Sequence, residues 1–136
     1  MSYAIEEIEG VGPAKARLLQ EAGIKTTEDL LTQAGSAKGR EALAAATGLR
    51  KAELLSYVNF ADLMRLHGVG QEFSELLEKA GVDTVKELAH RVPANLHAKL
   101  EATAEAHPRM VRRVPNAAEV AKWVTEAKTL EARVTH

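Results

Sequence analysis

The chain has 136 residues, a formal net charge of -1 at pH 7 and no cysteine. A chain of this length forms one domain or two very small ones and typically buries roughly two-thirds of its unfolded surface. The absence of cysteine excludes disulfides, thiolate zinc sites and cysteine nucleophiles. Acidic and basic residues are interspersed, which argues against a dedicated nucleic-acid binder because such domains are usually basic.

The start of the chain and its apolar stretches predict a cytoplasmic protein. Residues 1–7 have neither the basic start nor the apolar run of a signal peptide. No apolar stretch approaches the ~20 residues that a membrane-spanning helix requires. We therefore expect no contact with a membrane.

Apolar residues recur at helical spacing almost throughout the first half, which predicts an all-α fold without strands. Favoured capping and first-turn residues mark the expected helix starts, and glycines at Gly23 and Gly48 mark expected ends. The expected starts, in chain order, are Ser2 (a short helix through Ile5 and Ile8), Pro13, Thr26 and Ser36, followed by a helix that carries Leu54, Leu55 and Val58.

The second half shows the same kind of pattern. Asn59 is expected to cap a separate helix over residues 60–66, and Thr84 with Glu87 fits a capping box. Further helices are expected to start at Gln71, at Pro93 (ending near His107-Pro108) and at Asn116, the last with Val120, Trp123, Val124 and Leu130 on one face.

The two halves repeat one another at an offset of 58 residues. Over the 24 positions that begin at Ile8 and at Leu66, nine residues are identical. This degree of self-similarity predicts two copies of one helical unit, each with about five short helices. We expect the first unit to span residues 1–58 and the second, with the C-terminal helix, to span residues 59–136.

Each copy contains a Gly-Val-Gly stretch between two expected helices. Gly10-Val11-Gly12 returns as Gly68-Val69-Gly70. Glycine suits a tight reversal because it tolerates positive φ and close backbone approach, and the valine between the glycines is expected to be buried. The amides of the turn and of the following helix start then face outward, which is an arrangement that binds anions, above all phosphate.

Together with Leu18, Leu19 and Ala22-Gly23-Ile24, the first stretch resembles the helix-hairpin-helix motif of DNA-binding and DNA-repair proteins. The tandem arrangement is similar to a family of uncharacterised bacterial proteins with such repeats, over nearly the whole chain. This resemblance implies an all-α fold of two tandem helix-hairpin-helix (SAM-like) units. It also implies a phosphate-binding role for the first turn.

The residues after each turn predict different roles for the two copies. Lys15 and Arg17 follow the first turn and add cations to an anion-attracting helix start. The equivalent positions in the second copy are Phe73 and Glu75, with Glu72 before them, so we expect Gly68, Val69 and Gly70 to be mainly structural. The predicted nucleic-acid-binding residues are Gly10, Val11, Gly12, Lys15 and Arg17, together with Arg109, Arg112 and Arg113.

Arg109, Arg112 and Arg113 form the densest positive charge in the chain. Arginines this close together could clamp a phosphate or an acidic partner. The alternative is that they pair with acids of the preceding helix, such as Glu101 and Glu105.

The leading hypothesis is a non-catalytic protein that binds DNA or another nucleic acid weakly and without sequence specificity. The rival hypothesis is a protein-interaction module that uses the same fold as a scaffold, favoured by the near-neutral charge and the acidic second turn. No catalytic or metal-binding spacing is present in the sequence. We therefore expect no enzyme activity, cofactor, metal or small-molecule substrate.

Overall fold

The computed structural model describes residues 2–136, and this part of the chain is all-α, without β-strands, as predicted. None of its helices is long and apolar enough to cross a bilayer. The elements are a 3-10 helix η1 (Ile5–Glu7) and the α-helices α1 (Pro13–Glu21), α2 (Thr27–Ala34), α3 (Ala37–Thr47), α4 (Lys51–Leu63), α5 (Gln71–Lys79), α6 (Val85–Leu88), α7 (Pro93–Ala106) and α8 (Ala117–Ala127).

Side-chain caps mark four of the α-helix starts, as the sequence predicts. Thr26, Ser36 and Asn116 precede α2, α3 and α8, and each accepts a hydrogen bond from the backbone amide three residues later. Thr84 does the same for α6, but the predicted capping box is only half formed. The carboxylate of Glu87 instead accepts a hydrogen bond from Arg91, at 3.1 Å.

The predicted helix start at Asn59 is wrong, because α4 continues unbroken through this residue from Lys51 to Leu63. Buried residues precede and follow Asn59 in the helix, among them Val58, Phe60 and Ala61. Burial of these neighbours outweighs the preference of asparagine for helix ends. The expected unit boundary between residues 58 and 59 therefore falls inside α4.

The predicted cap at Ser2 is also wrong, since Ala4 precedes η1 and provides no side-chain cap. The backbone before η1 is extended and pairs with the segment that leads into α2. Thr27 donates its amide to the carbonyl of Tyr3 at 2.8 Å, and Ile5 donates to Lys25 at 2.9 Å. The backbone groups of Tyr3 and Ile5 are therefore bonded to the segment before α2 and are not available to a longer first helix.

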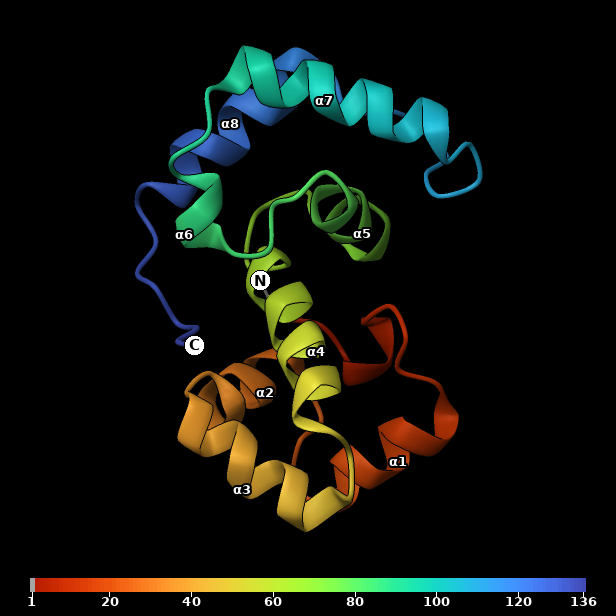
Figure 1. Ribbon diagram of the computed structural model, residues 1–136, viewed down its shortest axis with the longest axis vertical. Coiled ribbons are helices and arrows are strands. Elements are labelled where there is room, and N and C mark those ends of the chain that lie inside the picture. Colours follow the sequence, from red (N-terminus) through yellow and green to blue (C-terminus); the bar gives the residue numbers. More distant parts are fainter. Residues whose placement is uncertain (1) are drawn as a thin grey trace.

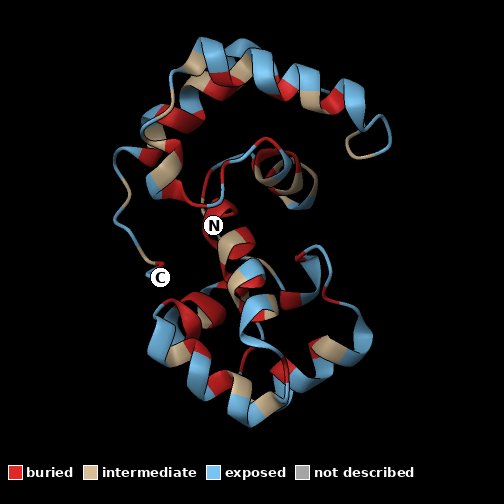
Figure 2. Cartoon of the chain, in the orientation of Figure 1, coloured by how far each residue is buried: buried red, intermediate tan, exposed pale blue. Residues whose placement is uncertain are grey.

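Two apolar cores lie at opposite ends of α4 (Figures 1 and 2). Helices α1 to α3 surround the lower end in this view, and α5 to α8 surround the upper end. Met64 belongs to the first core and its neighbour Leu63 to the second, so α4 and the residue after it serve both. We call the part around the first core the first half and the part around the second core the second half.

The C-terminal residues return to the first half. Beyond α8 the chain descends past α6 to the vicinity of α2 (Figure 1), and Val134 is buried in the first core. Thr135 donates its amide to the carbonyl of Gly35 at 2.9 Å. We call residues 131–136 the strap, because they leave the second half and end on the first.

Candidate functional site

At the first glycine turn, residues 10–12, both glycines are exposed and the valine is buried as predicted, but the valine amide does not face outward as expected. Gly10 has a φ of 91°, which an L side chain rarely adopts. Val11 is 7% exposed and belongs to the first core. Its amide is already used, since it donates to the carbonyl of Ile8 at 3.1 Å. The hydroxyl of Tyr57 donates to the carbonyl of Gly10 at 3.1 Å and anchors the turn to α4.

Gly12 is the residue before α1, and no side chain caps this helix. A Cβ built on Gly12 meets nothing within 4 Å, and its φ of -84° is ordinary. The expected conformational need for glycine at this position is therefore wrong. Instead, Gly12 leaves the start of α1 open to solvent, and its amide has no partner within residues 2–136. Pro13 supplies no amide, so the next donors of the helix start are those of Ala14 and Lys15.

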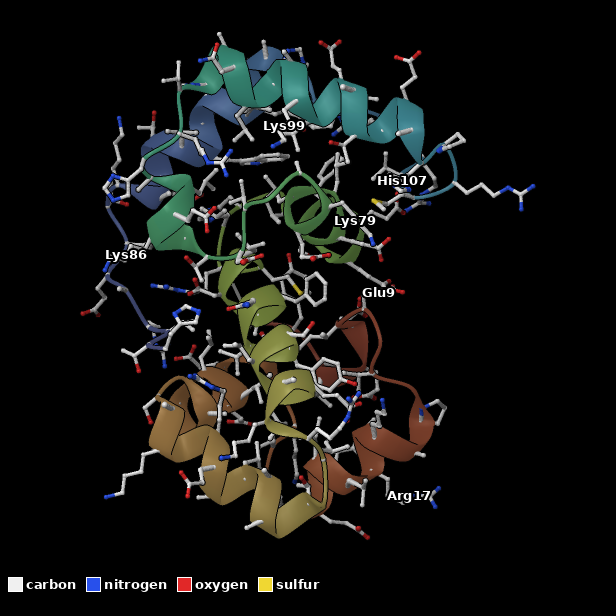
Figure 3. The ribbon with its side chains drawn as sticks, in the orientation of Figure 1. Glu9, Arg17, Lys79, Lys86, Lys99 and His107 are labelled. Atoms are coloured by element: carbon white, nitrogen blue, oxygen red, sulfur yellow. The ribbon has the colours of Figure 1, made fainter. Side chains whose placement is uncertain are left out.

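The cation closest to this helix start is partly neutralised. Nζ of Lys15 donates to Oε2 of Glu53 on α4 at 2.5 Å. This hydrogen bond raises the pKa of Lys15 and is the main reason that the pKa of Glu53 lies at about 2. An ammonium group has two further donors for a ligand. Arg17, two residues after Lys15 and therefore on another side of α1, is exposed and points outward (Figure 3), with no ion pair to any described residue.

The second glycine turn, residues 68–70, repeats the backbone of the first. Gly68 has a φ of 80° and Val69 is fully buried in the second core. The carboxylate of Glu72, in the first turn of α5, accepts hydrogen bonds from the amide and Nε of Arg112 at 2.8 and 2.9 Å. These bonds lower the pKa of Glu72. Glu72, at the start of α5, is therefore paired with Arg112, which lies in the loop that connects α7 to α8.

The arginines of this connection pair with acids other than those predicted. Arg113 makes a bidentate pair with Glu119, at 2.7 and 2.8 Å, and its guanidinium lies 5.2 Å from the ring centre of Phe73. The pair holds the pKa of Glu119 at about 2. Glu101 and Glu105, the acids expected from helical spacing, form no ion pair with these arginines. Arg109 is exposed and has no ion pair within the described chain.

Two adjoining clefts lie beside the second turn and the start of α5. The first has a volume of about 650 Å³ and is lined by Glu7, Gly70, Gln71, Glu72, Phe73, Arg112 and Arg113. The second, about 660 Å³, adds Glu9, Glu75 and Arg109. Gln71 crosses between the halves and donates to the carboxylate of Glu9 at 2.9 Å. Figure 3 shows Glu9 on the same side of the molecule as Lys79 of α5.

The structure therefore brings the predicted binding residues into two different surroundings. Gly10, Gly12, Lys15 and Arg17 belong to the first half, at the first turn and on different sides of α1. Arg112 and Arg113 lie at the second turn, where carboxylates alternate with guanidinium groups. The sequence did not indicate that Glu53 pairs with Lys15 or that Glu119 pairs with Arg113. The only signal for Glu53 was its capping position three residues after Arg50.

Acidic side chains and histidines do not gather into a metal-binding group of three or more anywhere in residues 2–136. No curated protein and no solved structure matches the chain. A family model described as a domain of unknown function (DUF4332) matches residues 9–130. Since this match covers most of the sequence, the chain belongs to that family.

Proposed function

We propose that the chain contains two helix-hairpin-helix units and that the first binds backbone phosphates of a nucleic acid, weakly and without sequence specificity. The observation that carries the proposal is the uncapped start of α1 behind exposed Gly12. Free amides and the positive end of the helix dipole attract an anion to this point. A helix start with an aspartate or serine cap would already have satisfied one of these donors.

The cations beside the helix start set the strength of binding. Arg17 is available as it stands, whereas Lys15 must share its ammonium group between Glu53 and a phosphate. Contacts with about two phosphates give a slope of about -2 in a plot of log affinity against log salt concentration. Binding should therefore be measurable at low salt and weak at physiological salt.

The test is a titration of a short DNA duplex at low salt, followed by fluorescence anisotropy. Gly12→Ala places a methyl group beside the open amide while the surrounding space can accept it. We expect this variant to fold normally and to bind at least threefold more weakly. Arg17→Glu should weaken binding about tenfold and lower the salt dependence, because a phosphate contact becomes a repulsion.

The matched control is Lys86→Glu, which makes the same charge change at an exposed residue on α6 in the second half, away from Arg17 (Figure 3). It should reduce affinity far less than Arg17→Glu. Glu53→Gln releases Lys15 and should strengthen binding. Equal loss in Arg17→Glu and Lys86→Glu, or no binding by the wild-type chain at tens of micromolar, would refute the proposal.

A second candidate function is binding of a protein partner at the two clefts beside the second turn. The observation that favours it is the pairing of Arg112 with Glu72 and of Arg113 with Glu119, which leaves a mosaic of charge instead of a positive surface. Phe73, half-buried beneath Arg113, adds apolar area to the same surface. Aromatic residues and arginine are both enriched in protein interfaces.

The two candidates make opposite predictions for one pair of variants. A protein partner should be retained after nuclease treatment, should be lost with Arg113→Glu and should remain bound with Arg17→Glu. Nucleic-acid binding should show the reverse sensitivity. Affinity purification with each variant, with and without nuclease, distinguishes them.

A further inference from the structure

The strap contacts the first half as a bound peptide contacts its receptor. It is extended and without regular secondary structure, and its partners lie about a hundred residues earlier in the chain. Arg133 donates to both carboxylate oxygens of Glu28 on α2, at 2.6 and 2.7 Å, and to the hydroxyl of Thr32 at 3.2 Å. The next residue, Val134, is buried in the first core.

The backbone of the strap is recognised as well. The amide of Thr135 donates to the carbonyl of Gly35 at 2.9 Å, and the carbonyl of Thr135 accepts from Nη2 of Arg40. Gly35 is required here, because a Cβ at this position would lie 2.3 Å from the carbonyl oxygen of Arg133. Main-chain hydrogen bonds combined with a pocket for one side chain are how many proteins bind extended peptides.

Arg40 is the most specific feature of this contact. It is 5% exposed and has no carboxylate partner among the described residues. Its guanidinium instead donates to the carbonyls of Ala34 and Gly35, at 3.1 and 2.8 Å, and to that of the strap. A buried arginine that satisfies carbonyl groups is costly unless all its donors are used. The strap carbonyl supplies one of the acceptors that make its burial tolerable.

We propose that Glu28, Thr32, Gly35 and Arg40 form a peptide-binding site on the first half, and that the strap occupies it as a releasable ligand. The peptide that fits is extended and carries an arginine followed by a small aliphatic residue, with the third residue bound through its backbone. This inference is independent of the proposed phosphate site, which lies on α1. Its consequence is that the strap adds a further non-covalent connection between the halves, besides α4 and the Gln71–Glu9 hydrogen bond.

The attached strap blocks the site in the wild-type chain. A tethered ligand has an effective concentration that is roughly millimolar for a short connection. A free peptide of the same sequence should therefore bind only when the strap is weakened. Val134→Asp weakens it at the pocket and Arg133→Glu weakens it at the ion pair, and both changes are outside the site itself.

The test uses the full chain and a fluorescent peptide with the sequence of residues 130–136. We expect the peptide to bind Val134→Asp or Arg133→Glu at least tenfold more tightly than it binds the wild-type chain. Circular dichroism checks the fold of each variant, and amide exchange of Thr135 by NMR checks that the strap has left. Because Arg133 and Glu28 are both partly exposed, Arg133→Glu keeps the test valid if Val134→Asp fails to fold.

A charge exchange provides the matched control. The chain carrying both Glu28→Arg and Val134→Asp should prefer a peptide with Arg133→Glu over the natural peptide. A folded variant with a released strap and no affinity for the peptide would overturn the proposal. A Thr135 amide that stays protected in both strap variants would overturn it too, because neither side chain would then hold the strap in place.

Discussion

Gly10 and Gly68 adopt φ values of 91° and 80°, and the valines that follow them are both buried. The helices that start after these turns nevertheless meet opposite surroundings. Neither helix start has a side-chain cap, and a Cβ would meet nothing within 4 Å at Gly12 or at Gly70, but after the first turn Arg17 is exposed. After the second, Glu72 is bonded directly to Arg112, and both residues line the same cleft. The two glycine turns of one molecule thus combine the same backbone with different chemistry.

This difference separates what a Gly-Val-Gly turn does for folding from what it does for binding. The positive φ and the buried valine belong to both copies, so they serve the fold. The cations belong to one copy, and carboxylates occupy the corresponding region of the other. The likeness of the turns therefore gives no reason to expect that both bind the same ligand.

The largest effect should come from removing the feature that the turns share. Val69→Asp places a charge at a fully buried position, and burial of an unpaired charge costs several kcal/mol. We expect the second half to unfold and the fluorescence of Trp123, the single tryptophan, to shift to that of an exposed indole. Val11→Asp should be milder, because Val11 retains some exposure. Equal destabilisation by the two variants would mean that the turns are equally embedded.

The second effect concerns the segment before each turn. In the second half, Asp62 is 1% exposed, accepts the amide of Val85 at 2.8 Å and pairs with Arg65. In the first half, the carbonyl of Tyr3 accepts the equivalent amide, that of Thr27. Asp62→Ala leaves a buried donor without its acceptor, so we expect a loss of about 2–3 kcal/mol in the free energy of unfolding. Urea unfolding measures this.

The control for that prediction is Asp83→Ala, which removes an exposed carboxylate from the same half. It should change the free energy of unfolding by less than about 0.5 kcal/mol. If Asp62→Ala were equally mild, the side chain would not replace the backbone acceptor of the first half.

Acid should act on both halves alike. The pKa of Glu53 in the first half and that of Glu119 in the second are lowered to about 2 by Lys15 and Arg113. A lowered pKa in the folded state means that the ionised group stabilises the fold above its ordinary pKa of 4.5. This contribution should disappear as the pH falls from 4.5 towards 2. Each of Glu53→Gln and Glu119→Gln should reduce the loss of stability between pH 6 and pH 3, measured by thermal unfolding.

The smallest effect is expected where Glu75 of the second half lies near Glu9 of the first half. Burial is the main reason that the pKa of Glu75 is raised, and Glu9 adds to the shift. A raised carboxyl pKa has the opposite sign: its stabilising effect is present at low pH and is lost as the pH rises through the folded value. Glu75→Gln should therefore raise the melting temperature at pH 7, by about 1–2 °C. The gain should vanish at pH 4, whereas a gain that is equal at both pH values would point to packing alone.

The sequence predicted the helices well where local signals determine them. Thr26, Ser36 and Asn116 cap the expected helices because a side chain three residues from its amide partner acts without tertiary help. The predicted helix start at Asn59 was wrong for the opposite reason, because tertiary contacts decided the outcome there. Its preference for a helix end was overridden when its neighbours were buried between two cores. Local propensity is weak compared with such burial.

The candidate sites were predictable only as lists of residues. The glycine turns, Lys15 and the arginines stand out in the chain, but their ion-pair partners lie 38 and 40 residues away for Lys15 and Arg112. Nothing in the spacing indicates that Glu53 reduces the charge of Lys15. The strap was missed entirely, because Arg133, Val134 and Thr135 carry no pattern until their partners on α2 and α3 are known.

The sequence by itself determined an all-α chain with two Gly-Val-Gly turns whose valines are buried, since periodicity, caps and glycine conformation act over a few residues. Tertiary structure alone decided that α4 serves both cores, which cations remain available and where the C-terminus binds. Those outcomes depend on which distant side chains share a surface. Charge and burial act through space, and the separation of residues along the chain does not encode the separation of their side chains in the fold.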